Sequence, residues 1–146
     1  MSLAGKLVDF FYRPSALGRV GPLELLVLQS TPFCNLDCSY CYLPNRRSTK
    51  RMSMEVLEAT VKEVFSSGIV DQQVTVLWHA GEPLAPGVKY YRQAIEIVER
   101  HAPKDVKVRY SVQTNGTLIN DDWCQLFNEK NFEVGVSVTV VSIRLR

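Results

Sequence analysis

The amino-acid sequence predicts an α/β fold in which helices alternate with the strands of one parallel sheet. Short apolar runs bounded by glycine or proline alternate along the chain with longer amphipathic helical patterns. Strands joined through helices in this way pair in parallel by right-handed crossovers. Of the 146 residues, 46% are hydrophobic and 22% charged, which is typical of a globular domain with one core. About four strand–helix units are expected, and they form an open α/β sheet or part of a β/α barrel.

The first unit begins with residues 23–29 (LELLVLQ), a nearly continuous apolar run between two turn signals. Such a run is typical of a strand that is buried on both faces. Ser53 is a suitable N-cap for a helix over residues 54–67, and Gly68 is suited to end it. Leu57 and Val61 lie on one face of this helix, which is therefore expected to be amphipathic.

The second unit repeats this pattern. Residues 74–78 (VTVLW) predict a strand that is rich in β-branched and aromatic side chains. Pro86 and Gly87 then precede a helical pattern that continues to about His101, and Pro103 ends it. A second strand and a second helix are therefore expected.

The last two strands are expected near the end of the chain. Apolar and polar residues alternate over residues 106–113, which predicts a third strand with one face wetter than the other. Asn120 is expected to cap a helix that carries Trp123, Leu126 and Phe127. Residues 132–138 then form the fourth predicted strand.

Three cysteines follow the first predicted strand in the segment CNLDCSYC. At this spacing one short loop can turn the thiols of Cys34, Cys38 and Cys41 toward one point. Converging thiolates favour a soft metal or an iron–sulfur cluster, and a cubane held by three cysteines keeps one iron open to another ligand. Cys124 lies in a helical pattern far along the chain, and we expect it to be a buried helix residue.

Two other uses of these cysteines are less favoured. A zinc site usually pairs its ligands as two separated short motifs, which this segment lacks. A disulfide framework needs an oxidising compartment, but the N-terminal MSLAGKLVDFFYRP lacks the apolar core and cleavage site of a signal peptide. We therefore expect reduced thiols and a cytoplasmic location, with a zinc site as the remaining alternative.

Unusual loops follow all three of the first strands. The cysteine segment follows the first, HAGEP (residues 79–83) the second, and QTNG (residues 113–116) the third. Functional sites of parallel sheets lie at the carboxyl ends of the strands. We therefore expect the three loops to meet at one rim of the sheet.

The charge distribution carries less information. The formal net charge is +2, and the one basic cluster, residues 46–51, is interleaved with hydroxyl side chains rather than aromatics. A solvated loop is the expected role of Arg46, Arg47, Lys50 and Arg51, with contact to an acidic peptide or a cofactor carboxylate as the alternative. A nucleic-acid partner is not expected, because the basic cluster has no interleaved aromatic residues. A membrane is not expected either, because no apolar run is long enough to cross a bilayer.

Together, these motifs resemble those of the radical S-adenosylmethionine (radical SAM) enzymes. Cys34, Cys38 and Cys41, with Tyr40 as the aromatic, match the C-x3-C-x-aromatic-C signature of that family. The segment AGEP (residues 80–83) is similar to its Gly-Gly-Glu-Pro motif. The segment YSVQTNGTLIND looks like the peptide-modifying branch with a SPASM-type auxiliary-cluster domain, which includes anaerobic sulfatase maturases. WHAGEPL most resembles maturases of glycine-rich-repeat peptides.

The resemblance implies a definite chemistry. The three cysteines would hold a 4Fe-4S cluster whose open iron binds S-adenosyl-L-methionine, and a 5′-deoxyadenosyl radical would modify a peptide or protein substrate. A flavodoxin or ferredoxin would supply the electron. By the same resemblance, the cofactor site would comprise the turn of residues 80–83 and two further residues. In the turn, the Gly81 backbone would receive the methionyl amine, Glu82 would orient the strand end, and Ala80 and Pro83 would complete the turn. Tyr40 would lie near the adenine, and Ser137 would approach the ribose or carboxylate.

The residues on their own leave simpler interpretations of some positions open. Glu82 could cap a turn or pair with a surface arginine, and Asn115-Gly116 is a common turn pair. His79 could contact substrate or cofactor, or could equally be a packed core residue. Ala80 replaces the first glycine of the motif, and we expect the change to cost little because one methyl group is small.

The resemblance also predicts how the chain is divided. Residues 1–22 are expected to be an N-terminal extension, residues 23–138 an incomplete radical SAM core comprising the N-terminal part of the barrel, and residues 139–146 a divergent tail. The family continues from the fourth strand as Ser-x-Asp-Gly, whereas Thr139 follows Ser137-Val138 here. We therefore expect a truncated enzyme whose open sheet exposes a large apolar inner face. The alternative is a non-catalytic iron–sulfur-binding fragment, and a structural zinc protein comes third.

Overall fold

Helices and strands alternate along the whole of the part that the computed structural model describes, residues 22–138. The order is β1 (Leu25–Leu28), α2 (Met54–Ser66), β2 (Gln73–Trp78), α3 (Val88–His101), β3 (Lys107–Thr114), α4 (Asp121–Glu129) and β4 (Glu133–Val136). Each element predicted from the sequence is present at its expected place. The first and last strands are shorter than expected, with 4 residues each.

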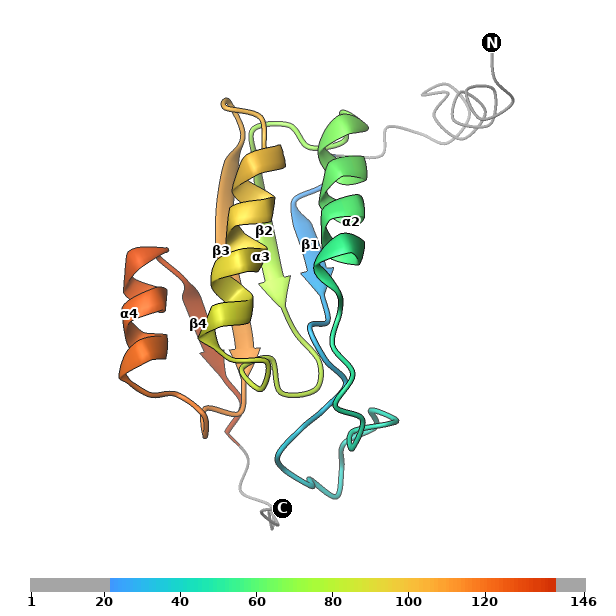
Figure 1. Cartoon of the computed structure of the whole chain (residues 1–146), viewed down its shortest axis with the longest axis vertical. Coiled ribbons are helices and arrows are strands. Elements are labelled where there is room, and N and C mark those ends of the chain that lie inside the picture. Colours follow the sequence, from blue (N-terminus) through green and yellow to red (C-terminus); the bar gives the residue numbers. More distant parts are fainter. Residues whose placement is uncertain (1–21, 139–146) are drawn as a thin grey trace, which may run out of the picture.

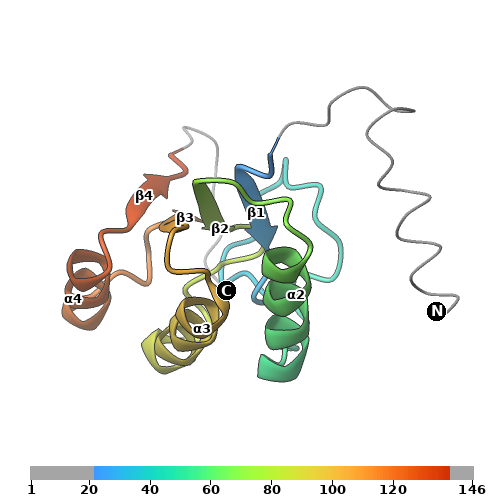
Figure 2. The same ribbon diagram turned by 90° about the horizontal axis from the view of Figure 1, so that it is seen from above.

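The strands form one parallel sheet in the order β1-β2-β3-β4, so strands that follow one another along the chain are also neighbours (Figure 1). All three helices lie on the same side of this sheet (Figure 2). A parallel sheet covered by helices on one side and open on the other is an arc of a β/α barrel. The structure thus confirms the predicted fold class.

The two predicted helix caps are both formed. The Ser53 hydroxyl accepts a hydrogen bond from the Val56 N–H at 3.3 Å, at the start of α2. The Asn120 side chain accepts one from the Trp123 N–H at 3.1 Å, at the start of α4. These bonds satisfy N–H groups that have no partner within the helix. Helix α3 begins instead after Gly87, whose φ of +89° suits glycine.

The hydrophobic core lies between the sheet and the helices. Trp78 at the end of β2 is fully buried, and its ring centroid is 5.0 Å from that of Tyr91 in α3. Tyr91 in turn packs edge-on against Trp123 of α4, with centroids 5.1 Å apart. Burying a large apolar side chain contributes about 1.5 to 3 kcal/mol. These aromatic contacts hold α3 and α4 against the carboxyl half of the sheet, next to the loops of interest.

The prediction that the first strand is buried on both faces is wrong. Leu28 is 4% exposed and faces the helices, but Leu25 and Val27 point to the opposite face and are 48% and 51% exposed. No helix covers that face in the described part of the chain (Figure 2). The apolar run thus predicted the strand correctly, but it did not predict that only one face of the strand is covered.

We call the sheet surface opposite the helices the open face. Its apolar part is confined to β1 and β2, where Leu25 pairs in register with Thr75 and Val27 with Leu77. On β3 it carries Arg109, Ser111 and Gln113, which alternate with the buried Tyr110, Val112 and Thr114. The expected apolar inner face is therefore found on β1, where Leu25 and Val27 are exposed, but it does not extend to β3, because the alternation there turns polar side chains toward it.

Cys124 is also placed differently from the prediction. Helix α4 buries Trp123 and Leu126, and the neighbouring Cys124 points away from them and is exposed. Successive helix residues are rotated by about 100°, so a residue beside a buried tryptophan need not share its face. None of the described helices has the length and apolar character needed to cross a bilayer. Most of the predicted N-terminal extension (residues 1–21) and the tail (residues 139–146) lie outside the described residues.

Candidate functional site

The three loops singled out in the sequence meet at the carboxyl ends of the strands, as expected. Beyond β1 and β2, the His79 N–H donates to the Leu28 carbonyl at 3.0 Å. The Glu82 N–H then donates to the Phe33 carbonyl at 2.6 Å, directly before the first cysteine. The HAGEP turn is therefore fixed against the chain that leads into the cysteine loop.

Gly81 lies where that turn touches the chain after β1. Its φ is +65°, in the left-handed region that favours glycine. A Cβ atom at this position would overlap the Thr31 carbonyl oxygen and would lie 2.7 Å from that of Phe33. Only a residue without a side chain permits this backbone approach.

Glu82 is a buried acceptor for three hydrogen bonds. Its Oε1 accepts from the Leu84 N–H at 3.0 Å and from the Thr114 hydroxyl at 2.6 Å. Its Oε2 accepts from the Asn115 N–H at 2.9 Å. The side chain is 0% exposed and has no arginine partner within residues 22–138, so the surface ion pair considered from the sequence is wrong. The carboxylate instead joins the HAGEP turn to the end of β3.

A buried tyrosine supports the same turn from the helix side. The Tyr91 hydroxyl donates to the Pro83 carbonyl at 2.7 Å and lies 3.2 Å from the Ser30 hydroxyl oxygen. Burial is the main cause that raises the pKa of Tyr91 far above its ordinary value, so the hydroxyl stays protonated and remains a donor. No pattern in the sequence indicated this role of Tyr91.

Asn115 connects the QTNG loop to the cysteine loop. Its Nδ2 donates to the Asn35 Oδ1 at 2.9 Å and lies 3.8 Å from the Cys34 sulfur. Its Oδ1 accepts from the N–H and the hydroxyl of Thr117 at 2.9 and 2.7 Å. The sequence indicated this residue only as a turn former, although its position at the shared rim was a signal for more.

The cysteine loop itself is held mainly through backbone groups. The Cys34 N–H donates to the Arg46 carbonyl at 3.0 Å, and the Cys41 N–H donates to the Cys38 carbonyl at 3.1 Å. The Arg46 guanidinium donates to the Cys38 carbonyl at 3.1 Å and lies 3.4 Å from an Asp37 oxygen. All three cysteines are free thiols and are partly exposed.

Among these thiols, Cys34 has the clearest electrostatic environment. Burial raises its pKa above the ordinary value, while hydrogen bonds from the Leu36 backbone and the Asn115 side chain act in the opposite direction. The nearby Glu82 carboxylate adds to the rise. The neutral thiol is therefore favoured in the metal-free protein, and a bound metal would compensate for the burial of a thiolate.

The predicted cofactor residues Tyr40 and Ser137, and the neighbouring candidate His79, all have exposed side chains. Tyr40 is 54% exposed, and Ser137 is exposed and accepts a hydrogen bond from the Gln113 amide at 3.0 Å. His79 is also exposed, so its interpretation as a packed core residue is wrong. His79 follows β2 and Ser137 follows β4, so both lie at the carboxyl ends of strands, whereas Tyr40 lies in the cysteine loop itself.

Alanine at position 80 destabilises the turn more than the sequence analysis predicted. Its φ is +72°, in the left-handed region where a Cβ atom crowds the following carbonyl oxygen. Alanine there is less favourable than glycine by about 1 kcal/mol. The expectation of a small cost considered only the volume of the methyl group and missed the backbone conformation.

Comparison with known proteins decides the family. Residues 28–146 match the Radical SAM superfamily. The chain is a member of the radical SAM superfamily. Among curated proteins it is 40% identical over 122 residues to an uncharacterised protein of Synechocystis, covering 81% of this chain and 31% of that one. It is 38% identical over 122 residues to a cysteine-type anaerobic sulfatase-maturating enzyme of Clostridium novyi, with 80% and 32% covered.

Solved structures agree with this radical SAM fold. The chain resembles anSMEcpe with bound AdoMet and the Cp18Cys peptide, with a TM-score of 0.69, 33% identity, and 79% of this chain and 31% of that one covered. Native anSMEcpe with bound AdoMet matches with a TM-score of 0.70 and 34% identity, over 79% and 32% of the two chains. The radical SAM chain thus spans about a third of the length of the relatives that it matches.

The thiols of this radical SAM chain fit an iron–sulfur cluster chemically. Three cysteines share one loop, and an amide side chain and a backbone N–H are directed at the Cys34 sulfur, as cluster sulfurs commonly require. Within residues 22–138, however, no three potential ligands are close enough together to hold one metal ion, so the predicted convergence of the three thiols on one point is not observed. A cubane binds each thiolate through a different iron atom, so its ligands are spaced more widely than those of a single ion.

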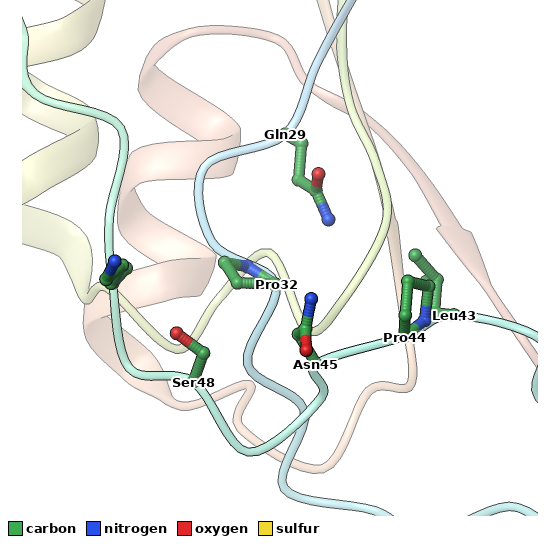
Figure 3. A pocket seen from close by; sticks show the side chains of 7 residues that line it. Gln29, Pro32, Leu43, Pro44, Asn45 and Ser48 are labelled. Carbon is green, nitrogen blue, oxygen red and sulfur yellow. The ribbon is translucent and has the colours of Figure 1, made fainter.

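A cavity of about 450 Å³ opens beside the cysteine loop (Figure 3). We call it the post-cysteine pocket, and it is lined by Gln29, Pro32, Leu43, Pro44, Asn45, Ser48 and Lys50. The amide side chains of Gln29 and Asn45 point toward one another from opposite sides of it (Figure 3). A neighbouring cavity of about 390 Å³ shares two of these residues and adds Arg46 and Arg47. The sequence did not predict this pocket.

Proposed function

We propose that this chain forms the cluster-binding part of a radical SAM enzyme that modifies a peptide or protein. The observation that carries the proposal is the hydrogen-bonded path from the cysteine loop through Asn115 to the buried Glu82. It brings a three-cysteine loop and an anchored cofactor turn to one rim. The likeness to anaerobic sulfatase-maturating enzymes supports a peptide substrate.

In this proposal Cys34, Cys38 and Cys41 are the ligands of a 4Fe-4S cluster. When bound, the cluster and S-adenosylmethionine would supply radical chemistry for hydrogen-atom abstraction from the substrate, started by one electron from an external donor. The chain contributes the thiolates and the donors around them. The Leu36 N–H and the Asn115 amide stabilise negative charge on the Cys34 sulfur, which tunes the reduction potential of a cluster held there.

The cofactor turn contributes position rather than acid–base chemistry. Gly81 leaves its backbone open to close approach by the methionyl group, while Glu82 keeps the turn in place through its three hydrogen bonds. We further propose that Tyr40 borders the adenine and that Ser137 borders the ribose or carboxylate. Both side chains are exposed at the rim and thus accessible to a ligand.

Two further parts of the proposal concern the cellular setting. A flavodoxin or ferredoxin is proposed as the electron donor, because cleavage of the sulfonium needs one electron at the cluster. The partly exposed cysteines give such a donor a short path to the site. Reduced thiols are stable in the cytoplasm, where we place the protein.

A non-catalytic iron–sulfur protein is the second candidate, and one observation favours it. The open face has no covering layer within the described residues (Figure 2), and the side chains of Tyr40 and Ser137 are exposed. A radical needs a site that excludes water. A chain that assembles the cluster but leaves the cofactor hydrated would bind iron without producing 5′-deoxyadenosine.

Anaerobic reconstitution with iron and sulfide tests the proposal. After anaerobic reduction with dithionite, we expect a reduced 4Fe-4S signal in electron paramagnetic resonance that changes when S-adenosylmethionine is added, together with 5′-deoxyadenosine and methionine as products of the one-electron cleavage. A cluster without either response supports the second candidate. Cys34→Ala should reduce the iron content by more than about tenfold, since no neighbouring thiol replaces the lost ligand. Cys124→Ala is the matched control, because that exposed thiol lies on α4 and should leave the iron content unchanged.

A further inference from the structure

The post-cysteine pocket is positively charged and has no function in the site described so far. Lys50 lines it, and Arg46 and Arg47 line the adjoining cavity, whereas no acidic side chain from the described residues 22–138 lines either one. Arg46 is engaged with Asp37 and the Cys38 carbonyl. Lys50 and Arg47 have no carboxylate partner within residues 22–138 and are exposed. Two cations are therefore available to a ligand at this place.

The backbone that carries Lys50 is fixed beside the end of β1. The Thr31 hydroxyl donates to the Lys50 carbonyl at 2.6 Å, and the Met52 N–H donates to the Ser30 carbonyl at 2.9 Å. On the other side of the pocket, the Ser48 N–H donates to the Asn45 carbonyl at 2.8 Å and closes a turn. The pocket is thus formed before a ligand arrives, so little ordering is needed on binding.

The lining matches a peptide that carries a carboxylate. The amides of Gln29 and Asn45 each offer a donor and an acceptor, which is what the backbone of an extended peptide requires. Pro32, Leu43 and Pro44 form apolar walls, and the Lys50 ammonium suits one negative charge. The pocket volume lies within the range of sites that take small ligands or side chains of a peptide.

We infer that the post-cysteine pocket binds an acidic segment of the peptide substrate and places it beside the cysteine loop. This inference rests on the proposed function for the identity of the ligand as a substrate. In it, Lys50 pairs with an aspartate or glutamate carboxylate, and Gln29 and Asn45 bind the peptide backbone. The basic cluster of residues 46–51 then selects substrates by charge, which replaces its interpretation as a merely solvated loop.

Peptide binding to the full chain tests the inference. The probes are a fluorescein-labelled cysteine-containing peptide with glutamates beside the cysteine, and the same peptide with glutamines. We expect the acidic peptide to bind at least about tenfold more tightly, because a charge-assisted hydrogen bond contributes that much. Lys50→Gln should remove this preference and Lys50→Arg should retain most of it, while both leave the glutamine peptide unaffected. The Lys50 side chain is exposed, so neither variant disturbs the core.

The matched control is Lys104→Gln, which makes the same change of charge at an exposed residue between α3 and β3. Equal affinity for the two peptides, or an equal loss in the Lys104 variant, would overturn the inference. It is also overturned if Lys50→Gln weakens binding of an acidic flavodoxin but not of the acidic peptide. Failure of the proposed function is seen separately, in the resonance signal and the 5′-deoxyadenosine assay, because peptide selectivity can be measured with or without a cluster.

Discussion

The HAGEP turn and the cysteine loop lie at the same rim but are held in opposite ways. The turn has a fully buried carboxylate with three hydrogen bonds, a buried tyrosine behind it, and a glycine packed against backbone carbonyls. The cysteine loop has partly exposed thiols, a tight turn, and contacts with Arg46 and Asn115. The segment with the most distinctive sequence is thus the less firmly fixed of the two.

This difference indicates a division of labour between the two segments. Hydrogen bonds within the chain hold the turn in place, whereas the cysteine loop offers thiols that act as metal ligands in the proposed function. Metal binding commonly contributes ordering energy to the segment that supplies the ligands. We therefore expect substitutions in the turn to reduce folding stability, and substitutions of the cysteines to reduce iron content while stability of the apo protein changes little.

The largest effect on stability is expected from Glu82→Ala. The Thr114 hydroxyl and the N–H groups of Leu84 and Asn115 would lose their acceptor in a buried environment, at a cost of about 3 kcal/mol. Urea denaturation of the apo chain measures the loss. Glu96→Ala on the exposed side of α3 is the control and should change stability by less than about 0.5 kcal/mol. Equal losses in the two variants would show that the turn is not the anchored region.

Gly81→Ala comes next and separates crowding from backbone strain. The new methyl group would overlap the Thr31 carbonyl in addition to straining the backbone, and the expected loss is about 2 to 3 kcal/mol. Gly68→Ala is a close match, since its φ is +71° and nothing lies within 4 Å of the added atom. This control should lose only about 1 kcal/mol. If thermal denaturation gives both variants the same Tm, the close approach of the Gly81 backbone to the Thr31 carbonyl does not contribute to the loss of stability.

Ala80→Gly should strengthen the turn. Glycine relieves the left-handed conformation, and the expected gain in the free energy of unfolding is about 1 kcal/mol. Chemical denaturation of the apo chain detects a change of this size. A loss of stability would mean that the alanine methyl group makes packing contacts that outweigh the backbone strain.

The smallest effect concerns an ion pair between α2 and α3, outside both regions. The hydrogen bond from His101, at 2.9 Å, is the main cause that lowers the pKa of the Glu58 carboxyl below its ordinary value of 4.5. Since the pKa is lower in the folded state, the stabilisation is present above pH 4.5 and is lost as the pH falls through the folded value. Glu58→Gln should lower the Tm slightly at neutral pH and leave it unchanged in strong acid. A difference that persists in acid would contradict this assignment.

The sequence was sufficient for the order of the elements but not for their surroundings. Periodicity and caps such as Ser53 and Asn120 are local signals, and both caps form as predicted. Whether the second face of β1 is covered depends on other segments, so the exposure of Leu25 and Val27 could not be deduced from their own run. Cys124 shows the same limit, because its exposure depends on how α4 rotates against α3.

For the site, the sequence predicted which loops meet but not how they are joined. The hydrogen bonds from Thr114 and Asn115 to Glu82 link residues more than 30 positions apart, and no local pattern signals them. The strain at Ala80 was also hidden, because a backbone dihedral angle is set by the turn as a whole. The three cysteines could be singled out as candidate ligands from their spacing, since three thiols within one short loop are a local feature, but their role as ligands stays a prediction.

Asn115 makes contacts with both the HAGEP turn and the cysteine loop. Asn115 gives its backbone N–H to the Glu82 carboxylate and directs its side-chain amide at Cys34 and Asn35. A displacement of the Cys34 sulfur would therefore also displace the backbone of Asn115, which directly follows β3. If the cysteines hold the proposed cluster, its binding or loss would alter the hydrogen bonds of the buried Glu82 carboxyl through this one residue, without any large movement of the chain.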